Sequence, residues 1–242
     1  MPFDEKEILK VINDTLNADK KTVREEKKRI SEAYVVQAKK YDITTDMLSG
    51  KAIKANIEDL NGYVEALNAV SAKLDSVDRS VSNDKDSSFR GIKQEEAYNM
   101  NGAFLSAYYF DNIADHASKI TMDSLAYMRL ARDFGTFEDW QRDFIACGMA
   151  SRDGWVCTVY NGFVDRYMNI YIDGNDMNLP MNCYPVIVLS VQERAYFRDY
   201  LNDRRKYIFA MMKELNWDLI DLRVQRADKI AKLLSTPLGS VK

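Results

Sequence analysis

Apolar residues recur every three to four positions over most of the first half of the chain. Over residues 44–78 they line one face of a predicted helix, which Thr45 could cap, and a further helix is predicted over 94–117. Two earlier helices are expected at 4–16 and 20–40, the second with dense charge and only a thin apolar stripe. The first half is therefore predicted to be helical.

The second half of the chain combines helices with short runs that are typical of strands. Two helices are predicted over 122–134 and 137–150, joined at Gly135. The later elements are expected to be strands at 155–160, 167–172 and 185–189, then helices at 190–212 and 217–234. The expected fold class is α+β, with an N-terminal helical hairpin and a C-terminal three-stranded antiparallel sheet with helices.

Three parts are expected along the chain. Residues 1–40 are a charged helical extension, 41–120 a helical hairpin domain and 121–242 an α/β domain that holds the sheet. A chain of 242 residues with 46% hydrophobic residues is long enough to bury a core. Its 10 Gly and 4 Pro are few for this length, which favours long helices and few tight turns.

Composition excludes several classes of protein. The 11% aromatic content and the net charge of −3 argue against disorder, and no run of 18 apolar residues predicts a membrane span. The mild negative charge disfavours direct contact with nucleic acid. Cys147, Cys157 and Cys183 form no C-x-x-C pair and are expected to be reduced, buried thiols. No targeting segment is visible, because the first residues are acidic.

An ordered set of short segments resembles the iron/manganese superoxide dismutase family. The segments are YV at 63–64, DFGTFE at 133–138, GW at 154–155, VQERAY at 191–196 and DYLNDR at 199–204. The resemblance covers about residues 42–230 and is stronger in the C-terminal half. It implies the family's fold, which agrees with the α+β plan.

The resemblance also implies where a metal would be held. Members of the family bind one iron or manganese ion through three His and one Asp, and the four positions correspond here to Ala55, Ala107, Ser190 and Arg194. Alanine has no donor atom, serine is a poor ligand for these ions, and arginine stays protonated. The one histidine, His116, is expected to be a surface or capping residue. We therefore predict no metal site and no cofactor.

The surroundings of the implied metal position differ from the family as well. The resemblance places Asp111, Cys157 and Gln192 where typical members have Trp. In the family, the Gln that hydrogen-bonds the metal-bound solvent comes from one of two positions, which correspond here to Ala103 and, approximately, to Asp176. Tyr63 matches the family's active-site Tyr. Both the ligands and the residues around them are therefore altered.

Arg194 needs a negatively charged neighbour if the pocket encloses it, because burying an unpaired charge is costly. The resemblance implies that the Glu before it reaches across a two-fold dimer interface, and Glu193 is retained. We expect Arg194 to pair with Glu193 of a partner, or with Asp111 or Asp176 of the same chain. Glu193, Arg194 and Tyr63 are the candidates for dimer or other interaction contacts.

Two functions are considered. Without metal ligands, the chain is predicted not to be an enzyme but a metal-free pseudoenzyme, because ligand-free relatives are structural proteins of the small subunit of mitochondrial ribosomes. The resemblance then implies a structural subunit of a large mitochondrial assembly on the matrix side, either that ribosome or a respiratory-chain or ATP synthase complex. The alternative is an active superoxide dismutase or another enzyme that uses the remodelled pocket.

The expected partners are other protein subunits of that complex. The chain is expected to form a homodimer or heterodimer through the dismutase-type interface, and residues 1–40 are the candidate docking arm.

Overall fold

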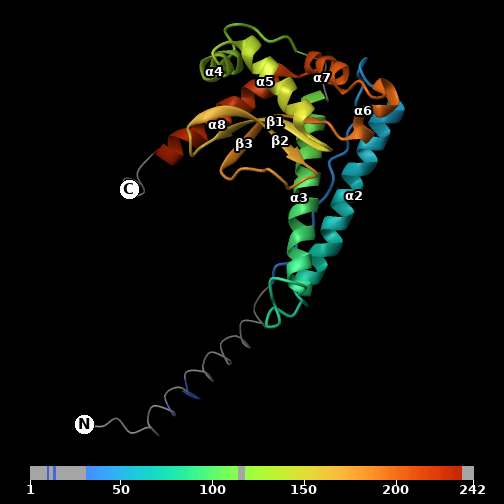
Figure 1. Ribbon diagram of the computed structural model, residues 1–242, viewed down its shortest axis with the longest axis vertical. Helices are drawn as coiled ribbons and strands as arrows, with labels where there is room; N and C mark the ends of the chain where they lie inside the picture. Colours follow the sequence, from blue (N-terminus) through green and yellow to red (C-terminus); the bar gives the residue numbers. More distant parts are fainter. Residues whose placement is uncertain (1–9, 11–12, 15–30, 114–117, 236–242) are drawn as a thin grey trace, which may run out of the picture. The chain divides into compact units, whose positions relative to one another are not determined.

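The computed structural model describes residues 31–113 and 118–235, together with residues 10, 13 and 14 (Figure 1). These residues divide into two compact units, a smaller one with the described residues up to 35 together with 68–93, and a larger one with 36–67, 94–113 and 118–235. The helix predicted over 4–16 lies almost entirely outside the described residues. The domain boundaries expected near 40 and 120 stay predictions.

Two long helices form the predicted helical hairpin. They are α2 (Gly50–Leu74) and α3 (Ser88–Ile113). Within the larger unit the ring of Tyr63 on α2 packs edge-on against Tyr98 on α3, with ring centroids 6.2 Å apart.

The first helix of the hairpin starts later than predicted. Ser49 Oγ accepts a hydrogen bond from Ala52 N at 3.3 Å, whereas Thr45 Oγ1 accepts one from Met47 N. The hydroxyl that closes the first turn of α2 is therefore that of Ser49, and the expected Thr45 cap was wrong.

The segment before α2 is extended where the sequence predicts a helix. Residues 31–45 contain no regular helix, so the helix expected over 20–40 is absent from its described part. In the smaller unit, Ser71 Oγ accepts from Tyr34 N at 2.6 Å and donates to Tyr34 O at 2.8 Å. Asp75 Oδ1 accepts from the backbone amides of Glu32 and Ala33. These side chains satisfy backbone groups that a helix would have paired internally.

The sheet has three antiparallel strands, as predicted. They are β1 (Gly154–Asn161), β2 (Arg166–Asp173) and β3 (Cys183–Ser190), in the order β2-β1-β3. Every residue of the central strand β1 is buried, because helices cover both faces. Trp155 on one face packs edge-on against Tyr109 of α3, and Thr158 on the other accepts a hydrogen bond from Trp140 Nε1.

Five helices complete the larger unit in its described part. They are α4 (Leu125–Phe134), α5 (Phe137–Ala150), α6 (Glu193–Tyr200), α7 (Arg204–Lys213) and α8 (Trp217–Ser235). The break between α4 and α5 lies at Gly135, whose φ of +96° favours glycine, as the sequence predicted. The single helix expected over 190–212 is divided in two, because Leu201 takes a φ of +51° and Asp203 caps α7 through Lys206 N.

A buried arginine connects α8 to α3 and β3. The Arg223 guanidinium lies 4.0 Å from the ring centroid of Tyr108 and donates to Asn112 Oδ1 and to Val186 O. It also lies 3.5 Å from the carboxylate of Asp111. Burial lowers the pKa of Arg223. Each of these partners compensates part of the cost of removing the charge from water.

Within the described residues, no helix is both long and apolar enough to cross a membrane.

We predict that Gly154→Ala destabilises the fold. A Cβ at Gly154 would lie 2.0 Å from Ile172 O, a backbone atom that cannot move without distorting the sheet. The free energy of unfolding, measured by urea denaturation, should fall by about 1–3 kcal/mol or more. The matched control is Gly62→Ala in α2, where nothing lies within 4 Å of the added methyl group, and stability should rise by about 0.5–1 kcal/mol. Equal effects of the two changes would contradict the prediction.

Candidate functional site

The four positions that the resemblance assigns to metal ligands lie on four different elements of the larger unit. Ala55 on α2 and Ala107 on α3 are half-buried, and Ser190 at the end of β3 is buried. Arg194, in the first turn of α6, is 72% exposed at its side chain. The first three offer no strong metal donor, and the fourth side chain points to solvent.

Five residues meet where α2, α3 and the sheet come together, and we call them the Asn175 cluster: Tyr63, Gly102, Trp155, Asn175 and Ser190. Trp155 Nε1 donates to Asn175 Oδ1 at 2.9 Å, which fixes the amide. Ser190 is the register partner of Trp155, so both side chains stand on the same face of the sheet. A Cβ at Gly102 would lie 2.6 Å from Asn175 Nδ2 and 2.7 Å from the Tyr63 ring. Glycine therefore permits this close approach.

Two polar atoms of the Asn175 cluster are buried without a hydrogen-bond partner in the described structure. They are Asn175 Nδ2 and Ser190 Oγ, on side chains that are almost fully buried. An unsatisfied buried polar group costs about 1–3 kcal/mol. Gln192 Nε2 lies 3.4 Å from the hydroxyl of Tyr63 and adds a further amide beside them. The cluster thus holds neutral groups that can donate hydrogen bonds to a small ligand.

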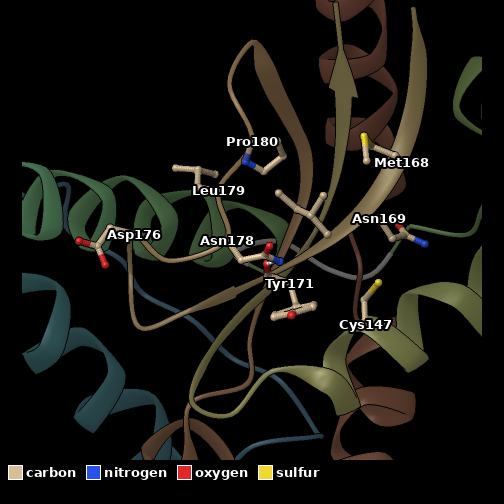
Figure 2. A pocket seen from close by; sticks show the side chains of 9 residues that line it. Cys147, Met168, Asn169, Tyr171, Asp176, Asn178, Leu179 and Pro180 are labelled. Carbon is tan, nitrogen blue, oxygen red and sulfur yellow. Dashed lines mark hydrogen bonds between the residues drawn. The ribbon is translucent and has the colours of Figure 1, made fainter. Parts of the chain in front are cut away.

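Asn175 is a site residue that the sequence prediction missed. The position of the family's Gln was assigned to Ala103 or, approximately, to Asp176. The amide that Trp155 holds belongs instead to Asn175, one residue earlier than Asp176. Asp176 lines a different hollow, beside the edge strand β2 (Figure 2). Asn175 carries an amide side chain and stands next to Asp176 in the same loop, and this was the sequence signal that could have identified it.

Arg194 pairs with a carboxylate that the sequence prediction did not name. The ion pair is with Asp59 of α2, whose side chain is 14% exposed, and neither Asp111 nor Asp176 is its partner as predicted. Burial raises the pKa of Asp59, and the Arg194 charge opposes that rise. Asp59 lies one helical turn before Tyr63, so the ion pair lies beside the Asn175 cluster on the same face of α2. The expected contact of Glu193 with a partner stays a prediction.

Asp111, which stands where the resemblance places a Trp, has a different role. Its carboxylate accepts from Lys39 Nζ at 2.8 Å and lies 3.5 Å from Arg223. The hydroxyl of Tyr41 donates to Ala107 O at 3.2 Å, and burial together with Asp111 raises the pKa of Tyr41. This part of the remodelled pocket is therefore a charge-balanced network.

The residues present do not fit an iron or manganese ion held as the resemblance implies. Ala55 and Ala107 supply no donor, and Arg194 supplies a cation that is already paired. In the described ranges, no three His, Cys, Asp or Glu side chains are grouped so that they could hold a metal ion. His116 lies outside those ranges.

Two hollows lie near the sheet, apart from the Asn175 cluster. A cavity of about 390 Å³ lies between α3 and the sheet, with Cys157 and Val159 of β1 in its wall. A more open hollow of about 590 Å³ follows β2, with Cys147 of α5 on one side and the loop through Asn178 on the other (Figure 2).

Comparison with known proteins gives a consistent result. Residues 123–223 match the model of the iron/manganese superoxide dismutase C-terminal domain. The chain is 31% identical over 173 residues to the "Superoxide dismutase [Fe]" of Cupriavidus metallidurans, covering 70% of this chain and 85% of that protein. It is 29% identical over 191 residues to the "Superoxide dismutase [Fe]" of Aquifex aeolicus, covering 77% and 89% of the two chains. It is 28% identical over 137 residues to the "Superoxide dismutase [Mn] 2" of Haloferax volcanii, covering 57% and 68%.

These comparisons correct one prediction. The chain was predicted not to be an enzyme because its ligand positions are substituted. The relatives that match most of its length are named as superoxide dismutases, which are enzymes, so that prediction was wrong. Substituted ligand positions bear on how a metal can be held and do not by themselves establish a loss of activity.

We predict that restoring the four donors increases metal binding. The combined variant Ala55→His, Ala107→His, Ser190→Asp and Arg194→His supplies the three imidazoles and one carboxylate that suit iron and manganese. After dialysis against manganese and then buffer, mass spectrometry of the metal should show content rising toward one ion per chain. The same variant without Ser190→Asp is the control and should retain less. Wild-type protein that already retains stoichiometric iron or manganese would contradict this.

Proposed function

Because this chain belongs to the iron/manganese superoxide dismutase family, we propose that it disproportionates superoxide, so that two anions and two protons give one O₂ and one H₂O₂, and that the anion binds at the Asn175 cluster. The observation that carries the proposal is the pair of buried, unpaired polar atoms, Asn175 Nδ2 and Ser190 Oγ. The relatives are named for superoxide. Three residues of the Asn175 cluster, Tyr63, Gly102 and Ser190, lie on α2, α3 and β3, which carry three of the four substituted ligand positions.

The chemistry of the cluster supports an anion as ligand. The NH₂ group of Asn175 is the unpaired part of the amide, since its carbonyl oxygen already accepts from Trp155 Nε1. The hydroxyl of Ser190, the register partner of Trp155, is a second unpaired group that can donate. An anion that accepts from both groups would remove the cost of leaving them unpaired, and a hydrogen bond to a charged group contributes about 1.5–3 kcal/mol.

The ion pair beside the Asn175 cluster shapes its electrostatics. Arg194 and Asp59 cancel each other's charge, so the cluster presents neutral donors rather than a free cation. Binding through neutral donors favours a singly charged anion over a multiply charged one such as phosphate, because desolvating the multiply charged anion costs more.

We predict that removing the Asn175 donor weakens anion binding. Asn175→Asp keeps the shape of the side chain but replaces the donor with an acceptor, so the affinity for azide, a small anion used as probe, should fall by roughly 10–100-fold. The binding can be followed by calorimetry or by intrinsic tryptophan fluorescence. Asn61→Asp, at an exposed position of α2, is the matched control and should bind as the wild type does.

The same samples test consumption of superoxide. With iron and manganese content measured, stopped-flow decay of superoxide should be faster with wild-type protein than with Asn175→Asp, and azide should slow it. Absence of saturable azide binding, or equal binding by wild type and Asn175→Asp, would refute the proposal.

A second function, as a subunit of a larger assembly, is favoured by the surface of α6. Phe197 is 42% and Leu201 63% exposed, and they lie close in sequence to the exposed Glu193 and Arg194. Exposed apolar residues with a charged rim are typical of protein interaction sites. The proposed partner is a second copy or another protein subunit, within the mitochondrial assembly that the sequence resemblance implied.

We predict that charge on this surface disrupts assembly. Phe197→Glu should lower the sedimentation coefficient of the protein in native extracts, because a carboxylate would be buried unpaired at the interface. Phe163→Glu, at the exposed turn between β1 and β2, is the control and should sediment as wild type. Sedimentation of Phe197→Glu with the same partners as wild type would count against an interface here.

A further inference from the structure

The cavity between α3 and the sheet has no role in the small-anion proposal. Its volume is about 390 Å³, within the range of about 300–1,000 Å³ that ligand pockets occupy. Its wall consists of residues from α3, all three strands and the loop after β2: Asn101, Phe104, Leu105, Tyr108, Cys157, Val159, Ile170, Ile172, Leu179, Cys183, Tyr184 and Pro185.

The cavity exists because a small side chain stands in a row of larger ones. On the face of β1 toward α3, Trp155, Cys157 and Val159 follow one another at alternate positions. Trp155 fills its position and packs against Tyr109. Cys157 is 1% exposed and leaves space beneath α3 that neither Leu105 nor Ile170 fills. Side chains in a well-packed fold leave few gaps of this size, so the cavity beside Cys157 calls for an explanation.

The wall determines what could occupy the space. Among the residues that the structure describes, no Asp, Glu, Lys or Arg lines it. The polar groups are the amide of Asn101, the hydroxyls of Tyr108 and Tyr184, and two thiols. Burial raises the pKa of both Cys157 and Cys183, so the thiols stay neutral. A charged ligand would lose its hydration without gaining a counter-charge, whereas an apolar ligand would lose nothing.

The rim of the cavity gives access from solvent. Phe104 of α3 and Leu179 of the loop after β2 both line it, and both are more than 40% exposed. Leu179 also borders the open hollow beside β2 (Figure 2). Two large apolar side chains that are half in solvent and half in the cavity wall form a mouth that an apolar molecule can pass.

We infer that this cavity binds one small, uncharged, largely apolar molecule, aromatic or aliphatic, between α3 and the face of the sheet that carries Cys157. The site is separate from the Asn175 cluster, and it takes an uncharged, apolar ligand where the cluster takes a small anion. The inference does not depend on the proposed binding of superoxide.

The test uses the full chain and N-phenyl-1-naphthylamine, an uncharged probe that fluoresces in apolar surroundings. Wild-type protein should bind it saturably, with one probe per chain, and indole should displace it. Cys157→Trp places a large side chain in the cavity and should lower the affinity by more than about tenfold. Met177→Trp adds the same side chain at an exposed position outside the cavity wall and should leave the affinity unchanged.

Circular dichroism and thermal unfolding verify that Cys157→Trp is folded. If it is not, Leu105→Phe is the second filling variant, and the expected loss of probe affinity is the same. Azide binding should survive in either variant, which separates this inference from the small-anion proposal. No saturable probe binding, or binding that is equal in wild type and a folded filling variant, overturns the inference, because the probe would then be held by exposed apolar side chains elsewhere.

Discussion

The buried positive charge of Arg223 must be compensated by partners from several elements of the larger unit. A guanidinium cannot lose its proton at physiological pH, so a buried one must be surrounded by acceptors and negative charge. Here it is met by the carbonyl oxygen of Val186, the amide of Asn112 and the ring of Tyr108. Asn112 in turn donates to Val188 O at 2.7 Å. The helix α3, the strand β3 and the helix α8 are thereby fixed to one another by one charge.

This constraint accounts for one of the substitutions in the remodelled pocket. Asp111, at a position where the resemblance places Trp, supplies the nearest negative charge to Arg223 and also accepts from Lys39. A tryptophan could do neither. The carboxylate therefore has a structural reason to be present. A similar exchange is seen at Arg194, whose charge is neutralised by Asp59 at the surface rather than inside the pocket.

The sequence predicted the elements well because their signals are local. The strands follow from short runs rich in β-branched and aromatic residues, and the break at Gly135 follows from a residue that readily adopts its positive φ. The break at Leu201 was missed, since leucine with a positive φ has no sequence signature. The site was harder to predict from the sequence. The contact of Arg194 with Asp59 joins α6 to α2 across more than half the chain. Asn175 is identified by its hydrogen-bond partner Trp155 and not by its neighbours in the sequence.

The Asn175 cluster and the cavity between α3 and the sheet are neighbours in the larger unit. Gly102 of the Asn175 cluster and Leu105 of the cavity wall lie three residues apart on α3, so they share one face of the helix. On β1 their counterparts, Trp155 and Cys157, alternate on one face of the sheet. The apolar cavity and the polar cluster therefore lie beside one another on one helix and one strand, although the ligands proposed for them are of opposite character.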